Sequence, residues 1–490
     1  MAPAGVFVTW KDKKISGGKS MTVVADNYDF VVIGCGAAGL SAAVSYIAAA
    51  RQQGHTPRVA VLESAPKEQR GGATRWTTAR FRAREDYSLD PLFVGKVQEA
   101  SRGLSDIEYC RVLEREVPNT LRFLEAHNIE LLHYGPPVAM SVEHEVTPNG
   151  GGHAIVEALA NSIEKSGNAE ILYQTEAIRL SLAADGRIQG VVVRGQDGLL
   201  RTLSARAVAL ACGGFEGNKE MLTRYLGPNA CDLPLLAPGL AFNQGAGIRM
   251  AMEIGAGTSG QFDMIHTELV DRRTSRPDAY IYGHPFGIVV NEHGKRFYDE
   301  GQGTFEETFE LIAFDVWRNQ NQTAFFVADQ TITGHKGIMV LFDTDKPPIE
   351  AGTLPELARL LGFEPEQFVR TVEEYNAAVG PGEFDPNRRD GKCTSGICPE
   401  KSNWAYRLEN PPFFAYPLIS AICFTYGGIR TDCDARVVTG NGVPLPGLYA
   451  AGEIVGLFYH EYPAGTSVLR SLTFGRIAGA HAAKSSLSNQ

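Results

Sequence analysis

Residues 28–39 read Tyr-Asp-Phe-Val-Val-Ile-Gly-Cys-Gly-Ala-Ala-Gly, an apolar strand followed by a glycine-rich turn. A helical run continues from Ala38 to about residue 53, and residues 58–62 form a second apolar strand that ends at Glu63. Strand, turn, helix and strand in this order predict a βαβ unit. The turn fits the pattern G-x-G-x-x-G, whose glycines permit a tight turn, backbone approach to a pyrophosphate and close helix packing. Because Glu63 can bind ribose hydroxyls, the stretch predicts a dinucleotide site.

Later segments favour FAD over NAD as the dinucleotide. Residues 71–74 (Gly-Gly-Ala-Thr) follow Glu63 closely enough to hold the pyrophosphate and ribityl chain. A late strand leads to residues 452–453, and a helix that opens near Ser467 adds backbone N–H groups and a helix dipole for a flavin. A second nucleotide fingerprint is absent from the sequence. The predicted cofactor-binding residues are Gly34, Gly36, Ala37, Ala38, Gly39, Glu63, Ser64, Gly71, Gly72, Ala73, Thr74, Thr77, Ala177, Ala211, Gly213, Gly214, Asn218, Gly452, Glu453, Ser467, Val468 and Leu469.

The bulk composition is typical of a globular protein with two or three domains. The chain has 490 residues, of which 44% are hydrophobic and 21% are charged. A net charge of -10 argues against a nucleic-acid partner. No apolar run reaches the roughly 20 residues that span a bilayer, so no integral membrane segment is expected. The chain has 8 cysteines and no C-x-x-C pair, which predicts no metal site, a reducing compartment and a cytoplasmic location.

The order of predicted elements indicates an α/β fold in which a discontinuous Rossmann-like domain carries an inserted α+β capping domain. The first part of the FAD-binding domain is predicted at 27–238, the capping domain at 239–395, and the second part of the FAD-binding domain at 396–490. The supporting patterns are helices at 154–166, 365–378 and 472–483, strands at 171–175, 287–291, 324–327 and 448–451, and a β-meander over 176–194 and 201–210.

Several strings resemble the FAD-dependent oxidoreductases of the fumarate reductase/succinate dehydrogenase flavoprotein superfamily. They are YDFVVIGCGAAGLSAA (28–43), LACGGFEGN (210–218), GIVVNEHGKRFYDE (287–300), GLYAAGEIVG (447–456) and LTFGRIAGAHAA (472–483). Within the superfamily, tricarballylate dehydrogenases are the most similar branch, through YNAAVGPGEFDP (375–386), KSNWA (401–405), PPFFAYPL (411–418), FTYGGI (424–429) and FYHEYPAG (458–465). The resemblance implies a substrate held between the two domains, over the flavin.

Two departures from the superfamily's pattern bear on the reaction. Fumarate reductases carry an Arg as proton shuttle shortly after the GKRF segment, whereas residues 299–315 here contain no Arg. They also carry a His pair where this chain has Cys423 and Phe424. Fumarate reduction is therefore not expected. Relatives with covalent FAD carry a His in the segment that matches 71–82, and none occurs here, so the resemblance implies non-covalent FAD.

The predicted reaction is desaturation of a C–C bond next to a carboxyl or keto group, with hydride transfer to flavin N5. The predicted substrate is a small molecule, a tricarballylate-like polycarboxylate or a related acid, and the electron acceptor stays open. Alternatives are an ene-reductase, an enzyme similar to 3-ketosteroid Δ1-dehydrogenases, whose catalytic Tyr-Pro pair resembles 462–463, and a non-catalytic flavoprotein. The predicted catalytic residues are Tyr462, Tyr426, His460 and Arg470. The predicted substrate-binding residues are His266, His284, Thr425, Tyr459 and Arg296.

Overall fold

The computed structural model describes residues 26–142, 144–277 and 279–487. The strands of its larger sheet are β1 (Asp26–Ile33), β2 (Val59–Leu62), β5 (Ala169–Leu172), β6 (Glu176–Leu182), β7 (Ile188–Arg194), β8 (Leu200–Leu210), β18 (Arg436–Val438) and β19 (Pro444–Ala450). Their order is β18-β19-β8-β1-β2-β5, and β7 and β6 continue from β8 as the antiparallel meander that the sequence predicts. β1 is parallel to β2 and β8, with Ile33 opposite Leu62 and Leu210. The first and last parts of the chain therefore share one sheet.

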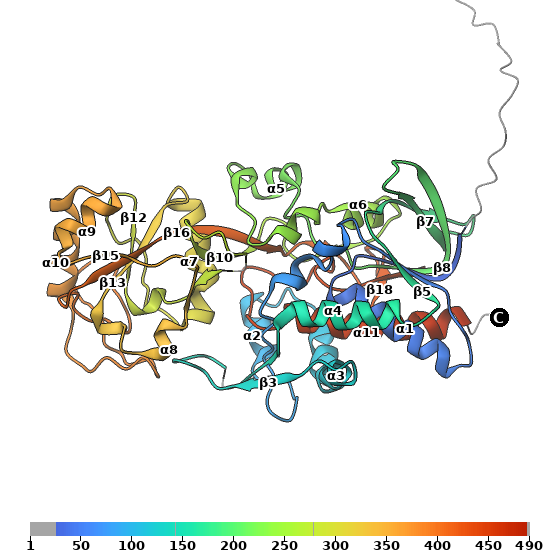
Figure 1. Cartoon of the computed structure of the whole chain (residues 1–490), viewed down its shortest axis with the longest axis horizontal. Coiled ribbons are helices and arrows are strands. Elements are labelled where there is room, and N and C mark those ends of the chain that lie inside the picture. The colour runs from blue at the N-terminus through green and yellow to red at the C-terminus, as the bar shows by residue number, and fades with distance from the viewer. Residues whose placement is uncertain (1–25, 143, 278, 488–490) are drawn as a thin grey trace, which may run out of the picture.

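Helices pack around this sheet. They are α1 (Ala37–Gln52), α2 (Phe93–Ala100), α3 (Ile107–Ala126), α4 (Gly151–Glu164), α5 (Lys219–Leu226), α6 (Ala246–Glu253) and α11 (Ser467–Leu487). α1 is rich in alanine, a strong helix former whose small side chain admits a close neighbour. α11 is that neighbour, and a Cβ at its Gly479 would lie 2.0 Å from the Ala42 carbonyl oxygen. Figure 1 shows α1, α4 and α11 in the same half of the molecule, at the end opposite the capping domain.

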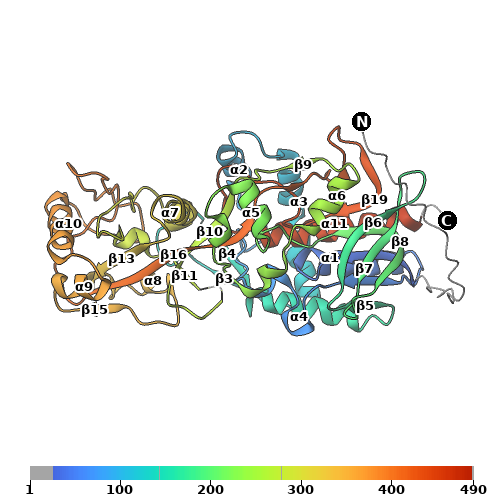
Figure 2. The same cartoon turned by 90° about the horizontal axis from the view of Figure 1, so that it is seen from above.

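The second sheet forms the capping domain. Its strands are β10 (Ile265–Asp271), β12 (Ile288–Asn291), β13 (Ala324–Asp329), β15 (Ile349–Ala351) and β16 (Phe413–Thr425). Its helices are α7 (Phe305–Asn319), α8 (Lys336–Met339), α9 (Leu354–Leu361) and α10 (Pro365–Ala378). The order β10-β16-β13-β12 is antiparallel, with β15 also paired to β16. Figure 2 shows β16 running from this domain toward the larger sheet.

Short elements complete the described chain. The two-stranded pairs are β3 (Leu131–Tyr134) with β4 (Glu145–Pro148), β9 (Thr258–Ser259) with β17 (Gly428–Ile429), and β11 (Tyr280–Ile281) with β14 (Phe342–Asp343). The 3-10 turns are η1 (Lys67–Gln69), η2 (Gly72–Trp76), η3 (Ala230–Asp232), η4 (Pro238–Phe242), η5 (His284–Phe286) and η6 (Gln330–Ile332).

Two apolar cores support the predicted α/β fold with a separate cap. Residues from β1, α1, β8 and α11 share the first core, and residues from β12, β13, α7 and α10 share the second. Ile248 and Ile265 belong to the first core, whereas Trp404 and Leu418 belong to the second. We therefore propose that the capping domain runs from within β10, after Ile265, to within β16, after Leu418 and before Ile422, later at both ends than 239–395. The sequence could not show this, because β16 reads as buried strand in either domain.

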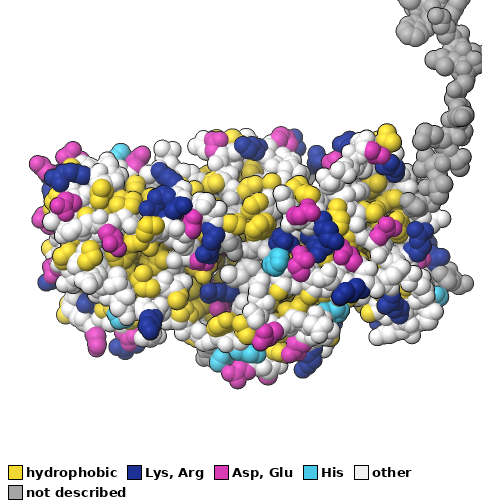
Figure 3. Space-filling model, viewed as in Figure 1, with side chains coloured by type: hydrophobic (Ala, Val, Ile, Leu, Met, Phe, Trp, Pro, Cys, Tyr) yellow, Lys and Arg dark blue, Asp and Glu magenta, His cyan; other side chains and the backbone are white. Residues whose placement is uncertain are grey.

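The surface, the helices and the cysteines can be compared with the composition of the chain. In the described ranges, no helix is both long and apolar enough to cross a bilayer. On the face shown in Figure 3, Lys and Arg side chains are interspersed with Asp and Glu side chains. All eight cysteines fall within the described residues and are free thiols.

Candidate functional site

A cavity of about 620 Å³ runs between the two domains. One end is lined by the turn after β1, the loop at 71–74 and the ends of β2 and β8. The other end is lined by residues of β10, β16, the start of α7 and the loop before α11. We name these the nucleotide end and the substrate end.

The glycine turn forms the wall of the nucleotide end. Gly34 has φ +110°, and a Cβ there would lie 2.2 Å from the Ala211 carbonyl oxygen, so only glycine fits. A Cβ on Gly36 would meet nothing closer than 3.5 Å, so this backbone is open to an approaching group. The Ala37 N–H at the start of α1 donates to Thr74 Oγ1 at 3.1 Å. Bare backbone at a helix N-terminus fits a pyrophosphate.

Glu63 closes the nucleotide end at the tip of β2. Its Oε1 accepts the Ala65 N–H at 2.8 Å, and its Oε2 accepts the Cys35 N–H at 3.3 Å. Burial raises the pKa of this carboxyl, and the backbone N–H groups oppose that rise. The Ser64 hydroxyl also donates to Oε1 at 3.4 Å, and the carboxylate lines the cavity, where it offers acceptor oxygens that fit a ribose hydroxyl.

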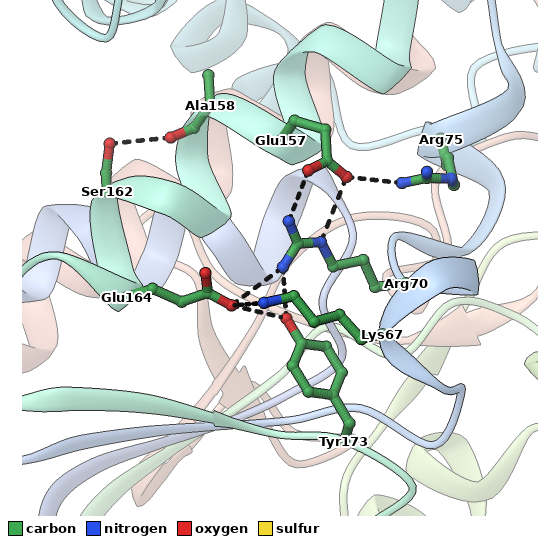
Figure 4. Close-up of polar contacts among 8 residues, drawn as sticks. All are labelled: Lys67, Arg70, Arg75, Glu157, Ala158, Ser162, Glu164 and Tyr173. Atoms are coloured by element: carbon green, nitrogen blue, oxygen red, sulfur yellow. Dashed lines mark hydrogen bonds and ion pairs between the residues drawn. The ribbon is translucent and has the colours of Figure 1, made fainter.

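The 71–74 loop is anchored from outside the cavity by Arg70 (Figure 4). Arg70 is buried and pairs with Glu157 at 2.6 Å and Glu164 at 3.2 Å, both on α4. Arg75 also pairs with Glu157, at 2.8 Å. The pairing of Arg70 and Arg75 with α4 indicates that they fix the loop that lines the cavity.

A buried acid pair lies beside the cavity wall. Glu453, which lines the cavity, accepts the Thr425 N–H at 2.9 Å, and Glu216 accepts the Asn243 amide at 2.5 Å. Burial, together with the charge of Glu453, raises the pKa of Glu216 well above its ordinary value. Burial thus favours the acid form of Glu216.

Tyr462 marks the substrate end. Its hydroxyl oxygen accepts the N–H groups of Thr466 at 3.0 Å and Ser467 at 2.9 Å, where α11 begins. Burial raises the pKa of Tyr462, while these two N–H groups oppose the rise. The phenol therefore keeps its proton at neutral pH, and both N–H donors leave that proton free to be donated into the cavity.

His266 is the centre of a charged network behind Tyr462. Its Nδ1 contacts Glu310, and its Nε2 lies 3.3 Å from Glu268 Oε1. Burial alone lowers the pKa of His266, but the two carboxylates raise it to about 9, so the ring is an imidazolium at neutral pH. Glu310 also accepts the Tyr426 hydroxyl and the Tyr462 N–H. The His266 and Tyr462 rings lie 4.9 Å apart between centroids.

Several side chains at the substrate end were not predicted. Because cap elements supply most of them, no sequence spacing relates them to the glycine turn. Two departures noted in the sequence could have pointed to some of them: the stretch without Arg, which holds the first turn of α7, and the pair Cys423 and Phe424. The unpredicted lining residues at this end are Arg80, Met140, Glu145, Glu268, Tyr282, Phe305, Glu306, Phe309, Cys423 and Phe424.

Most predicted cofactor-binding residues line the cavity, as do two of the predicted catalytic and substrate-binding residues. These lining residues are Gly34, Gly36, Ala37, Ala38, Glu63, Ser64, Gly71, Gly72, Ala73, Thr74, Thr77, Ala177, Ala211, Gly213, Gly452, Glu453, Ser467, Val468, His266 and Tyr462. Their contacts with a cofactor or substrate stay predictions.

Four predicted cofactor-binding residues lie behind the wall instead. A Cβ on Gly39 would lie 1.9 Å from the Gly34 carbonyl oxygen, so this glycine packs α1 on the turn. Gly214 lies against Glu453 and Thr425. Asn218 caps α5 by accepting the Met221 N–H, and the side chain of Leu469 is fully buried. These four support the lining residues.

Three predicted catalytic residues also lie off the cavity. Tyr426 is buried against Glu310. Arg470 is buried, donates to the Val455 carbonyl at 2.9 Å and lies over the Phe458 ring. The His460 N–H donates to Gln261 at a turn with φ +61°. The side chains of Tyr426 and Arg470 are thus bonded to neighbouring protein groups, and the catalytic roles of all three residues stay predictions.

Four predicted substrate-binding residues have structural partners. Arg296 pairs with Glu300 at 2.6 Å, and His284 bonds to Thr308 in the second core at 2.8 Å. The Tyr459 hydroxyl accepts the Gly260 N–H at 2.9 Å. The side chain of Thr425 faces Glu453. None of the four lines the cavity.

A possible metal cluster also lies at this end, where the sequence predicts no metal site. His266, Glu268 and Cys423 place one ligand atom each within 4.8 Å of one another. Both nitrogens of His266 already face carboxylates, and burial raises the pKa of the Cys423 thiol well above its ordinary value. We therefore describe the cluster as part of the proton network.

Comparison with known proteins agrees with this geometry. The family model described as "FAD binding domain" matches residues 29–468. A 4-oxocyclohexanecarboxylate 2-dehydrogenase of Sinomonas cyclohexanicum is 31% identical over 358 residues, covering 67% of this chain and 60% of that protein. A 3-oxosteroid 1-dehydrogenase of Mycobacterium tuberculosis is 26% identical, covering 68% and 63%. The match thus spans less than two thirds of both curated relatives.

The fold is also similar to a solved structure. The open conformation of a flavocytochrome c3 fumarate reductase aligns with a TM-score of 0.73 at 22% identity, covering 94% of this chain and 79% of that chain. The family model and the curated relatives confirm the predicted superfamily, whereas the similarity to tricarballylate dehydrogenases stays a prediction. The chain belongs to the FAD binding domain family, within the fumarate reductase/succinate dehydrogenase flavoprotein superfamily.

Proposed function

We propose that the protein is an FAD-dependent dehydrogenase that introduces a C=C bond next to the keto group of a small substrate. The observation that carries the proposal is the Tyr462 hydroxyl, which two backbone N–H groups hold at the substrate end of the cavity. A neutral phenol fixed in this way donates a hydrogen bond to a carbonyl oxygen and stabilises the negative charge of an enolate. Two relatives, named for an oxocyclohexane acid and for oxosteroids, support a keto substrate.

Side chains of the protein remove the α proton, orient the base and exclude water. FAD, when bound, accepts the hydride that leaves the carbon β to the carbonyl. The α proton goes to a base, for which we assign Glu268, the carboxylate beside the His266 ring that faces Tyr462. The Tyr282 hydroxyl donates to the other oxygen of Glu268 at 2.8 Å and so orients it. The rings of Phe309 and Phe424 line the same end and keep water from it.

A polycarboxylate substrate has less support. Among the described residues that line the cavity, Arg80 and Arg194 are the Arg or Lys side chains. Arg194 lies on β7 and pairs with Glu176 at 3.0 Å, next to the nucleotide end. Tricarboxylate binding would place several negative charges beside one Arg and several acids. Reduction of an activated alkene uses the same groups in reverse, and it is the second candidate.

FAD is proposed to be held without a covalent bond, because residues 71–82 offer no His, Cys or Tyr. Acid precipitation of the purified protein should release the flavin into the supernatant. Flavin that stays with the protein pellet would contradict this part of the proposal.

Tyr462→Phe tests the proposed role most directly. It should slow anaerobic flavin reduction by 4-oxocyclohexanecarboxylate or a 3-oxosteroid by about 100-fold. Tyr459→Phe is the matched control, because its hydroxyl also accepts a backbone N–H but lies off the cavity, and it should stay near the wild-type rate. An unchanged rate in Tyr462→Phe would remove Tyr462 from the chemistry. No reduction by any ketone would overturn the reaction class.

A further inference from the structure

At the substrate end of the cavity, the guanidinium of Arg80 makes few and long hydrogen bonds to the described residues. Arg80 lines the cavity, and its Nη1 lies 3.5 Å from Glu145 while its Nη2 lies 3.4 Å from the Tyr280 hydroxyl. Good charge-assisted hydrogen bonds of Arg are about 2.7–2.9 Å long. Arg80 has five N–H donors, and these two long contacts are the ones it makes among the described residues. A planar donor group is therefore available to a ligand.

Arg80 lies beside the proposed catalytic loop. Two residues further along, the Arg82 N–H donates to the Gly465 carbonyl at 3.0 Å, and the Arg82 side chain donates to the Ala464 carbonyl. Gly465 follows Tyr462 in the same loop and also lines the cavity. Arg80 and Tyr462 thus line the same end of the cavity.

Glu306 carries a second polar group at this end that lacks a partner among the described residues. Its Oε1 accepts the Ser141 N–H, whereas its Oε2 is buried and has no hydrogen-bond partner among the described residues. The residue is 7% exposed and lines the cavity. Burial raises the pKa of Glu306, so its acid form is favoured and can donate a proton to an anionic oxygen.

We propose that Arg80 binds a single carboxylate carried by the keto substrate, with Glu306 donating to the same carboxylate, so that the substrate is a keto monocarboxylate. Arg supplies paired, parallel donors that match the two oxygens of a carboxylate. A second or third carboxylate would face Glu145 and Glu268, which line the same end. Arg80 is thus a specificity-determining residue. The inference rests on the proposed function only for the keto group, and the carboxylate subsite stands by itself.

Ketone-free probes test the subsite without turnover. Cyclohexanecarboxylate and its uncharged amide, cyclohexanecarboxamide, are titrated into the FAD-loaded protein, and binding is followed by the change in the visible flavin spectrum. The wild type should bind the carboxylate at least about 10-fold more tightly than the amide. Arg80→Gln should remove this preference while leaving amide binding unchanged, and Arg80→Lys should keep part of it. Arg111→Gln, which removes an exposed Arg elsewhere, should behave as the wild type.

Each result is decisive for the subsite. Equal binding of the two probes by the wild type, no binding of the carboxylate, or a preference that survives in Arg80→Gln would overturn the proposal. Tricarballylate that binds more tightly than cyclohexanecarboxylate would overturn the restriction to one carboxylate. Failure of the proposed function looks different, because it is seen only as missing flavin reduction by ketones.

Discussion

At the nucleotide end of the cavity the backbone of two glycine-rich turns forms much of the wall, whereas at the substrate end side chains from many separate segments form it. The nucleotide end offers N–H groups, one acid and bare backbone, which suit a ligand that many proteins share. The substrate end offers Tyr462, His266, Glu268 and Arg80, whose positions depend on how the cap packs on the larger sheet. Cofactor binding is thus a property of local geometry, and substrate choice a property of tertiary packing.

Gly36→Val should have the largest effect and tests the backbone character of the nucleotide end. The new side chain meets no protein atom closer than 3.5 Å at its Cβ, so the fold should persist, but it occupies the space that a pyrophosphate needs. FAD affinity should fall on the order of 100-fold, measured by equilibrium titration of the apoprotein. Gly95→Val in α2, where a Cβ meets nothing within 4 Å, is the control. Unchanged FAD affinity in Gly36→Val would falsify the assignment of this turn.

Arg70→Gln tests whether the anchor of the 71–74 loop is needed for stability and for FAD binding. Removing a buried partner of two carboxylates should lower the free energy of unfolding by about 3 kcal/mol and weaken FAD binding with it. Urea unfolding and FAD titration measure both. Arg187→Gln, which breaks an exposed pair at 4.0 Å, should change neither by more than about 1 kcal/mol. Equal effects of the two variants would mean that the anchor is not needed.

Glu310→Gln addresses the substrate end. It removes one of the two carboxylates that raise the pKa of His266 to about 9, so that His266 loses its proton at lower pH. Flavin reduction by a ketone should slow about 10-fold, and its alkaline limb should move to lower pH, while FAD affinity stays unchanged. Asp315→Asn, further along α7, is the control. A pH profile identical to the wild type would exclude coupling through Glu310.

The smallest expected effect is on how the free energy of unfolding depends on pH. The pKa of His266 is raised from 6.5 to about 9 in the folded protein. The folded state therefore binds this proton more tightly, so the contribution to stability is full below pH 6.5 and is lost as the pH rises through 9. The stability difference between wild type and His266→Gln should shrink over that window, as measured by urea unfolding at several pH values. A difference that stays constant would contradict the ion-pair network.

The comparison also explains what the sequence could predict. The turn at 34–39, Glu63 and the loop at 71–74 are local patterns whose spacing dictates their geometry, and they line the cavity where expected. Arg80, Glu268 and Glu306 come from three distant segments, so only the packed fold shows that they meet. Arg470 shows the converse: it lies close to Tyr462 in the chain, but its side chain donates to the Val455 carbonyl and lies off the cavity.

The cap boundaries illustrate the same limit at the level of domains. The strand pattern at 413–425 is equally typical of either sheet, and only its pairing with β10 and β13 assigns it to the cap. The strands of the βαβ unit needed no such information, because the glycine-rich turn and the helix that join β1 to β2 place the two strands side by side in one sheet.

Anaerobic mixing of the purified, flavin-loaded protein with 4-oxocyclohexanecarboxylate tests the central claim most directly. The account predicts rapid loss of the visible absorbance of oxidised flavin, with formation of one unsaturated keto acid per flavin reduced. It also predicts that Tyr462→Phe makes this loss about 100-fold slower. An oxidised flavin spectrum that persists with this acid and with 3-oxosteroids alike would contradict the account.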